Sequence, residues 1–224
     1  MKLLRAARAS ILIAAAIALS GCGGGGAAGT DATANKALDV PSKEELMRDG
    51  PLGERVLGKA TAPITIIEYA SLTCPHCRNY HAKIFPRVKR EYIDTGKVRY
   101  IIREFPIGRT AGAAAIITRC SPEPKYLSVM ESFLARQPEW VSQEVRPDAI
   151  FSVAKSSGMT RETFDKCLSN QTIIEGLTEV KQRGRQFGVI GTPTFFINGR
   201  KAQGEVTFDE IKAMIEQAPS PTSS

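Results

Sequence analysis

Two cysteines three positions apart, in the sequence Cys74-Pro75-His76-Cys77, are the residues best suited to chemistry. They follow the apolar run 64–69, which predicts a strand covered on both faces. Pro75 suits the first position of a helix, where its missing N–H costs nothing. A cysteine at the start of a helix is stabilised as a thiolate, and a partner one turn later closes a disulfide with it. The pattern therefore predicts thiol–disulfide chemistry rather than structural packing.

Three polar residues around this pair are candidates for supporting it. His76 lies between the cysteines and adds a hydrogen-bond donor for a thiolate. Glu68 lies inside the apolar run, where a carboxylate is unfavourable unless it has a function, although an edge position reaching solvent is the alternative. His81 follows Cys77 by one helical turn and either tunes the pair or is simply exposed.

The first residues read as an export signal. Lys2, Arg5 and Arg8 precede an apolar stretch, 9–19, that is too short to cross a membrane as a helix. The next residues, Leu19-Ser20-Gly21-Cys22, resemble the bacterial lipobox, which implies cleavage before Cys22 and acylation of that cysteine. The alternative is an ordinary secretory signal that leaves Cys22 as a spare thiol. We therefore expect a lipoprotein signal peptide at 1–21 and a flexible, Gly- and Ala-rich tether at 22–38.

The number of cysteines fits this interpretation. There are five, and an odd number is awkward for an exported protein. Lipid on Cys22 and a reactive pair at Cys74 and Cys77 leave Cys120 and Cys167. In an oxidising compartment we favour a structural disulfide between these two over a pair of buried free thiols.

Length and charge limit the domain organisation and the classes of function that the chain can have. About 180 of the 224 residues follow the leader and tether, enough for one domain at 39–218 before a disordered tail at 219–224. The formal charge is +7, and removing the three leader cations leaves about +4. No basic tract has interleaved aromatic residues, so nucleic-acid binding is excluded. The short basic run Lys181, Arg183, Arg185 is interpreted as a solvated helix face.

The pattern along the chain is strand, helix, strand, several helices, hairpin and helix. We expect an edge strand at 55–57, a helix from Pro75 kinked at Pro86, and a strand at 98–103. Helical signals then fill about 110–187, with Thr110 and Thr160 as caps and Gly184 as a weak point. Asn198-Gly199 predicts a tight hairpin after the strand 194–197, and Thr207 with Glu210 predicts a capping box.

Two motifs in this order resemble the DsbA-like thiol:disulfide oxidoreductases. They are Cys74-Pro75-His76-Cys77 and, more than a hundred residues later, the Gly-Thr-Pro-Thr-Phe-Phe-Ile-Asn-Gly sequence of residues 191–199. The resemblance extends from about Val56 to Gln217. It implies an α/β thioredoxin fold with an inserted all-helical subdomain at about 110–187. It also implies no cofactor other than the Cys74–Cys77 disulfide itself.

The same resemblance implies roles for three further residues. Pro193 would be the cis-proline that lies against the reactive cysteines, and a plain trans turn is the alternative. Thr192 would offer backbone hydrogen bonds to an extended substrate chain. Glu68 would be the buried acid that accepts or relays a proton for Cys77.

Four functions remain to be weighed. The first is a disulfide-introducing oxidase for reduced exported proteins, monomeric and lipid-anchored in the periplasm or cell envelope, with a DsbB-like membrane reoxidase as partner. The second is a reductase or isomerase on the same scaffold, which Thr192 keeps open because strong oxidants often carry Val there. The third is a metal-binding module using Cys74, Cys77 and His81, which is disfavoured because a closed structural zinc site needs four ligands. A scaffold without catalysis is disfavoured because both cysteines are present.

Overall fold

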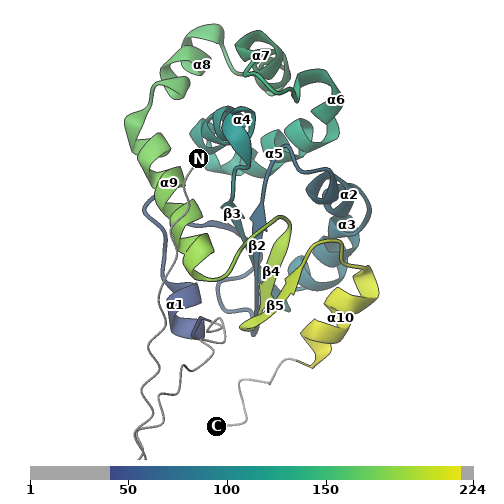
Figure 1. The fold of residues 1–224 in the computed structure, drawn as a ribbon. Coiled ribbons are helices and arrows are strands. Elements are labelled where there is room, and N and C mark those ends of the chain that lie inside the picture. The colour runs from purple at the N-terminus through teal and green to yellow at the C-terminus, as the bar shows by residue number, and fades with distance from the viewer. Residues whose placement is uncertain (1–40, 218–224) are drawn as a thin grey trace, which may run out of the picture. The chain divides into compact units, whose positions relative to one another are not determined.

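A five-stranded mixed sheet, in the order β1-β3-β2-β4-β5, lies at the centre of the fold (Figure 1). The computed structural model describes residues 41–217. Strands β2 and β3 are parallel, and the other neighbouring pairs are antiparallel. The strands are β1 (Arg55–Leu57), β2 (Ile64–Ala70), β3 (Val98–Glu104), β4 (Thr194–Ile197) and β5 (Arg200–Gln203). The last five residues of the central strand β2 are buried, which confirms the strand predicted from the apolar run.

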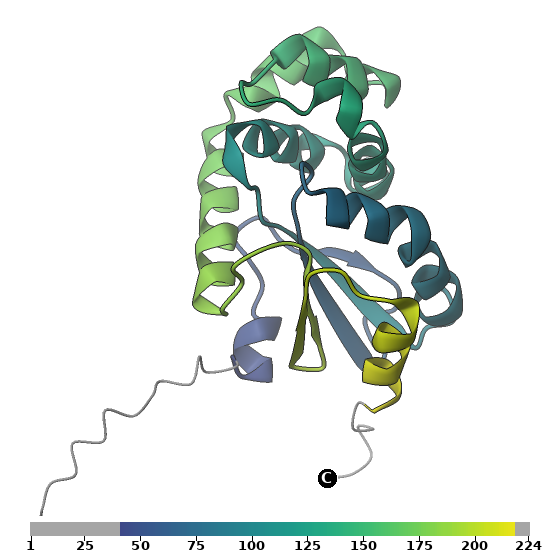
Figure 2. The same cartoon turned by 45° about the vertical axis from the view of Figure 1, so that its right-hand side comes forward.

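Helices cover both faces of this sheet (Figure 2). On one face the chain that starts at the reactive pair forms α2, then α3 and the π-helical turn η1, with α10 beside them. On the other face lie α1 and the C-terminal part of α9. Their bounds are α1 (Lys43–Met47), α2 (Pro75–Lys83), α3 (Phe85–Val88), η1 (Lys89–Ile93), α9 (Gln171–Gln186) and α10 (Phe208–Glu216). The predicted kink near Pro86 appears as a break at Ile84, between α2 and α3.

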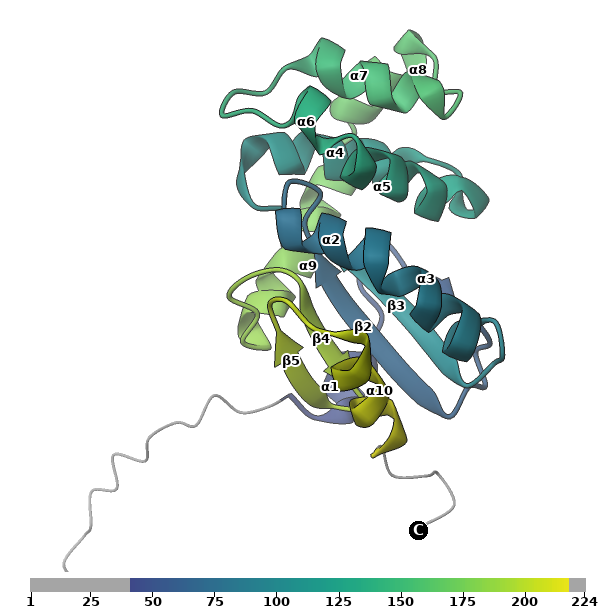
Figure 3. The same cartoon turned by 90° about the vertical axis from the view of Figure 1, so that its right-hand side faces the viewer.

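The chain between β3 and β4 is helical, which is the insertion expected from the sequence. Its first helices form a layer beyond the end of the sheet at which α2 begins (Figure 3). They are α4 (Gly108–Cys120), the 3-10 turn η2 (Glu123–Lys125), α5 (Tyr126–Ala135), α6 (Gln137–Trp140), α7 (Pro147–Ser156) and α8 (Arg161–Leu168), followed by α9. This is an α/β thioredoxin-like fold with a helical insertion.

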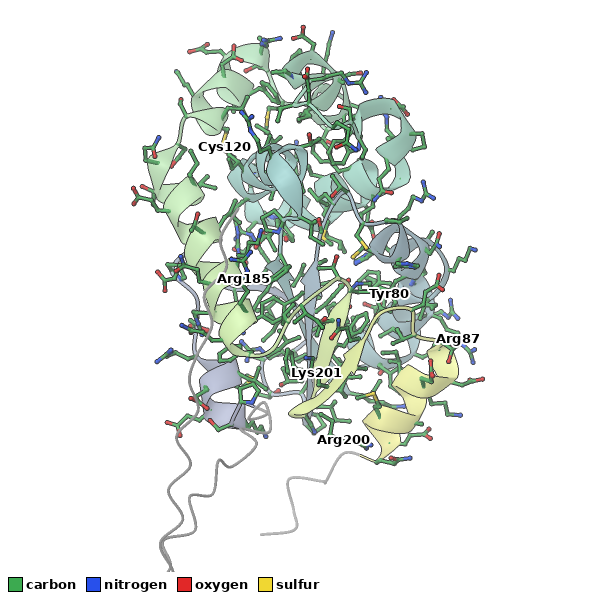
Figure 4. The ribbon with its side chains drawn as sticks, in the orientation of Figure 1. Tyr80, Arg87, Cys120, Arg185, Arg200 and Lys201 are labelled. Atoms are coloured by element: carbon green, nitrogen blue, oxygen red, sulfur yellow. A yellow bond between two sulfur atoms is a disulfide. The ribbon has the colours of Figure 1, made fainter. Side chains whose placement is uncertain are left out.

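A disulfide joins two helices of the insertion. Cys120, at the end of α4, is bonded to Cys167 of α8, with their Cα atoms 6.0 Å apart (Figure 4). This is the pairing favoured by the count of cysteines. It ties α4, which follows directly from the sheet, to the outer part of the insertion.

The interpretation of the basic run as a solvated face is wrong. Arg183 is buried, and its guanidinium donates to the carbonyls of Asp49 at 2.8 Å and Arg48 at 2.6 Å. Lys181 is half-buried and donates to the carbonyl of Pro106 at 2.6 Å. Only Arg185 is exposed, because α9 lays one side of this run against the sheet.

Three local expectations also need correction. Thr110 does not cap α4, which begins two residues earlier, and its hydroxyl instead donates to the carbonyl of Ser142 at 3.0 Å. Gly184 is no weak point, since a Cβ there would lie 2.8 Å from the ring of Tyr69, so the glycine allows close packing. Helix α1 was not expected, although Ser42 and Glu45 form a capping box at its start.

Several predictions concern residues outside those described. The signal peptide at 1–21, the lipidation of Cys22, the tether at 22–38 and the tail at 219–224 all lie there. Within residues 41–217, no helix has the length and apolar character needed to cross a membrane.

Candidate active site

The two reactive cysteines lie at the first turn of α2. Cys74 is the N-cap, Pro75 takes the first helical position, and the N–H of Cys77 points at Cys74 Sγ at 3.5 Å. Both cysteines are free thiols in this structure. Cys74 keeps 8% of its surface exposed and Cys77 keeps none. One sulfur of the pair is therefore accessible to another thiol, and the other is reached only through it.

The two thiols have opposite acidities. The pKa of Cys74 is lowered to about 5, chiefly by a hydrogen bond from the Cys77 thiol. The Thr192 side chain and the N–H groups of Cys77 and His76 lower it further, against the opposing effect of burial. Burial raises the pKa of Cys77 well above its ordinary value, and its bond to Cys74 and the charge of Glu68 raise it further. At neutral pH the accessible sulfur is thus a thiolate and the buried one a thiol.

The Thr192-Pro193 segment lies against the nucleophile. The peptide bond between these residues is cis, as the family resemblance implies. Cys74 Sγ lies 3.1 Å from the carbonyl oxygen of Thr192, to which the sulfur donates only in its protonated form. The structure therefore brings together four of the residues predicted for the site, Cys74, Cys77, Thr192 and Pro193, although they are more than a hundred positions apart in the chain.

Glu68 is fully buried beneath the pair, so the edge alternative is wrong. Its carboxylate accepts from the hydroxyl of Tyr100 at 2.8 Å and lies 3.0 Å from Nε2 of His81. The hydroxyl oxygens of Tyr80 and Tyr100 are 3.1 Å apart. Burial and the charge of Glu68 raise the pKa of both tyrosines, which therefore stay protonated as donors. The result is a closed polar network inside an otherwise apolar core.

His81 takes part in this network and is buried, so its reading as an exposed residue is wrong. It faces Glu68 through Nε2, while its Nδ1 has no hydrogen-bond partner within residues 41–217. Among the same residues, no three His, Cys, Asp or Glu side chains are grouped so that they could hold a metal ion.

His76 is exposed and points away from the buried network. Its Nδ1 lies 3.2 Å from a carboxylate oxygen of Glu205, in the segment between β5 and α10. The His76 contact lowers the pKa of Glu205. Beside this pair lies a hollow of about 190 Å³, with Tyr80, Pro193 and Val206 in its wall (Figure 4 labels Tyr80).

Gln137, at the start of α6, is a site residue that the sequence analysis missed. Its buried side-chain amide donates to the carbonyl of Leu72 at 2.7 Å and to that of Cys74 itself at 2.9 Å. A residue of the insertion thus holds the loop that carries the nucleophile. No local signal predicts this, because a single glutamine between two helices has no distinctive pattern; only the fold places it there.

Comparisons with known proteins agree with this geometry. A sequence model described as thioredoxin matches residues 52–217. A Rickettsia bellii protein named "Putative protein-disulfide oxidoreductase" is 34% identical over 169 residues, which cover 74% of this chain and 64% of that protein. Disulfide bond formation protein D of Bacillus subtilis is 26% identical over 74% of this chain and 77% of its own length. The match thus spans somewhat less than two thirds of the rickettsial relative.

Solved structures give the same result. The crystal structure of alpha-DsbA1 from Wolbachia pipientis superposes with a TM-score of 0.72 and 28% sequence identity. The superposition covers 80% of this chain and 96% of that one.

Proposed function

The chain belongs to the thioredoxin family, in its DsbA-like branch, and on that premise we propose that it is a thiol:disulfide oxidoreductase that introduces disulfides into exported proteins. The observation that carries the proposal is the asymmetry of the pair. An accessible Cys74 with a pKa near 5 stands next to a buried Cys77 whose pKa is raised. A stabilised thiolate favours the reduced form of the enzyme, so its disulfide form is an oxidant.

The reaction follows from this asymmetry. A thiolate of the client protein attacks Cys74 Sγ of the Cys74–Cys77 disulfide, that bond breaks, and the sulfur of Cys77 leaves. A second client thiolate then attacks the client sulfur of the mixed disulfide and releases Cys74 as a thiolate. Two electrons pass from the client to the enzyme, and the client gains one disulfide. The low pKa of Cys74 makes it the better leaving group in the second step.

Cys77 needs a proton when it leaves and loses one when the pair is reoxidised. Besides Cys74, Glu68 is the ionisable group whose charge acts on Cys77, and it is held by Tyr100 and His81. Glu68 is therefore the residue that we assign to this proton transfer, with His81 and Tyr100 as the residues that position its carboxylate. Pro75 starts the helix, and Thr192 and Pro193 offer the edge along which an extended client chain would pair.

A reductase or isomerase is the second candidate. Thr192 in front of the cis-proline favours it, as the family pattern indicates. The reduction potential separates the two, and the test is equilibration of the purified protein with glutathione redox mixtures. A value near the roughly −120 mV of known DsbA supports the oxidase, and one near −200 mV or below supports the reductase or isomerase. If Cys74 and Cys77 do not exchange with glutathione at all, the proposed chemistry is wrong.

We further propose that the chain acts in the cell envelope as a lipoprotein. The lipobox-like sequence ending at Cys22 supports this, together with the structural disulfide Cys120–Cys167, which needs an oxidising compartment. Residues 1–21 would be the signal peptide and 22–38 the tether of the domain at 39–218. A DsbB-like membrane reoxidase would remove the two electrons from each cycle, and the enzyme would act as a monomer.

The anchor is tested by the Cys22→Ser variant. If Cys22 carries lipid, the wild-type protein partitions with membranes and the variant appears in the soluble fraction of the envelope. Mass spectrometry of the N-terminal peptide gives the same answer directly. Absence of lipid from the N-terminal peptide of the wild-type protein would rule out the anchor without affecting the proposed redox chemistry.

A further inference from the structure

A second hollow, of about 340 Å³, runs between α4 and α9. This volume lies in the range typical of ligand-binding pockets. Its floor is apolar, with Ile116 on one side and Ile174 on the other. Gly108 and Gly112 keep the α4 side open, since a Cβ on either would meet nothing within 4 Å. Two glycines at the spacing of one helical turn thus line the α4 side of the groove.

The rim of the groove at its α9 side is cationic. Lys181 and Arg185 both line it. The acidic residues of α9, Glu175 and Glu179, are not among the lining residues. Neither cation forms an ion pair with a carboxylate in the part of the chain that the structure describes. Partial burial and the nearby Arg185 lower the pKa of Lys181, because the two cations repel each other, and a carboxylate bound between them would relieve this repulsion.

One end of the groove lies close to the loop that carries Cys74. Its near end is formed by Pro106 and Gly108, on either side of Ile107. The carbonyl of Ile107 accepts from the hydroxyl of Thr73, the residue before Cys74, at 3.4 Å. Ile107 itself is 49% exposed although it is apolar. A polypeptide whose cysteine reacts at Cys74 would pass over Ile107 on its way into the groove.

We propose that this groove binds an extended client segment that carries an acidic residue, while the cysteine of the same client reacts at Cys74. The apolar floor takes aliphatic side chains, and Lys181 and Arg185 pair with the carboxylate. The inference rests on the proposed function and adds a preference among clients to it. It places recognition on the helical insertion, on the other side of Cys74 from the hollow next to His76.

The test uses two synthetic peptides that share one intramolecular dithiol and differ at flanking positions, which are glutamate in one and lysine in the other. At low ionic strength, wild-type enzyme should oxidise the glutamate peptide about fivefold faster, as expected for one partly exposed ion pair. Arg185→Glu should remove or reverse this preference. Gly112→Phe should fill the groove and slow both peptides.

Two controls separate this inference from the function on which it rests. Oxidation of dithiothreitol reports the Cys74–Cys77 chemistry alone and should be the same for wild type, Arg185→Glu and Gly112→Phe. Arg200→Glu makes the same charge change on β5, outside the groove, and should keep the wild-type preference (Figure 4 labels both arginines). Equal rates for the two peptides, or an equal effect of both charge reversals, would overturn the groove assignment. Failure with dithiothreitol would overturn the proposed function instead.

Discussion

The acidity of Cys74 depends mainly on a residue that never touches a client. The largest cause of its low pKa is the hydrogen bond from the buried Cys77 thiol, followed by smaller effects of Thr192 and backbone N–H groups. The helix start contributes through those N–H groups, because Cys74 is the N-cap of α2. The two cysteines are therefore a single functional unit even when they are reduced.

This dependence predicts how the thiolate titrates. In the reduced protein, thiolate absorbance at 240 nm should rise with a midpoint near pH 5 and disappear in Cys74→Ser. In Cys77→Ala the midpoint should move upward, because the main donor to the thiolate is lost. His76→Ala should have a smaller effect, since its side chain faces Glu205 rather than the sulfur. A midpoint that stays in place in Cys77→Ala would show that the backbone alone stabilises the thiolate.

At the scale of elements, the insertion and the sheet meet at the reactive loop. The side-chain amide of Gln137, in α6, donates hydrogen bonds to two carbonyls of the reactive loop, those of Leu72 and Cys74. The carbonyl of Cys74 also accepts a bond from the N–H of Arg78 at 3.1 Å. The amide of Gln137 places partial positive charge next to the nucleophile's own peptide group. It thus holds the loop in place and offsets the negative end of a carbonyl dipole close to the thiolate.

We therefore expect Gln137→Met to act on both stability and acidity. Loss of the donor leaves the buried carbonyl of Leu72 unsatisfied, which costs about 1–3 kcal/mol in the free energy of unfolding. The pKa of Cys74, followed at 240 nm, should also rise, a change that a purely structural role would not produce. The matched control is Gln186→Met, the same replacement at an exposed position of α9. An unchanged pKa in Gln137→Met would limit Gln137 to a structural role.

The elements that the sequence predicts well are those with strong local signals. The apolar run of β2, the Asn198-Gly199 turn and the caps at Thr160 and Thr207 all appear where their patterns place them. Contacts between distant segments leave no such signal. The burial of Arg183 against the N-terminal segment and the reach of Gln137 to Leu72 depend on tertiary packing.

In the candidate site, too, local features can be predicted from the sequence and contacts between distant segments cannot. The reactive role of Cys74 and Cys77 can be predicted from their spacing, and the burial of Glu68 can be predicted from its place in an apolar strand. The pairing of Glu68 with His81 cannot be predicted in this way. The sequence alone allows His81 to be exposed or buried on its helix, and only the packing of α2 on the sheet brings it to Glu68.

At the scale of the whole molecule, the disulfide Cys120–Cys167 closes a loop of 47 residues inside the insertion. In the chain-entropy description, a loop of this length stabilises the fold by about 4 kcal/mol. The double variant Cys120→Ala/Cys167→Ala should therefore lose about 2–4 kcal/mol in the free energy of unfolding, measured with urea. Neither sulfur contacts the reactive loop, so dithiothreitol oxidation should persist below the unfolding transition. Loss of activity without loss of stability would contradict this separation.

The redox state of the pair also couples to the stability of the whole domain through pH. Cys74 has a pKa near 5 when folded and an ordinary value of 9.0 when it is unperturbed. A lowered folded pKa stabilises the native state fully above the unfolded value, and this contribution is lost as pH falls through the folded value. The reduced protein should therefore gain stability between about pH 5 and pH 9.

The oxidised protein has no titrating thiol at Cys74 and lacks this gain. Urea unfolding of both forms across that range, with Cys120–Cys167 intact, should give a difference that grows with pH in favour of the reduced form. Entropic effects of the Cys74–Cys77 disulfide shift the difference by a constant and leave its slope unchanged. Parallel pH profiles for the two forms would mean that the thiolate is not stabilised by folding. The proposed oxidising character would then lose its physical basis.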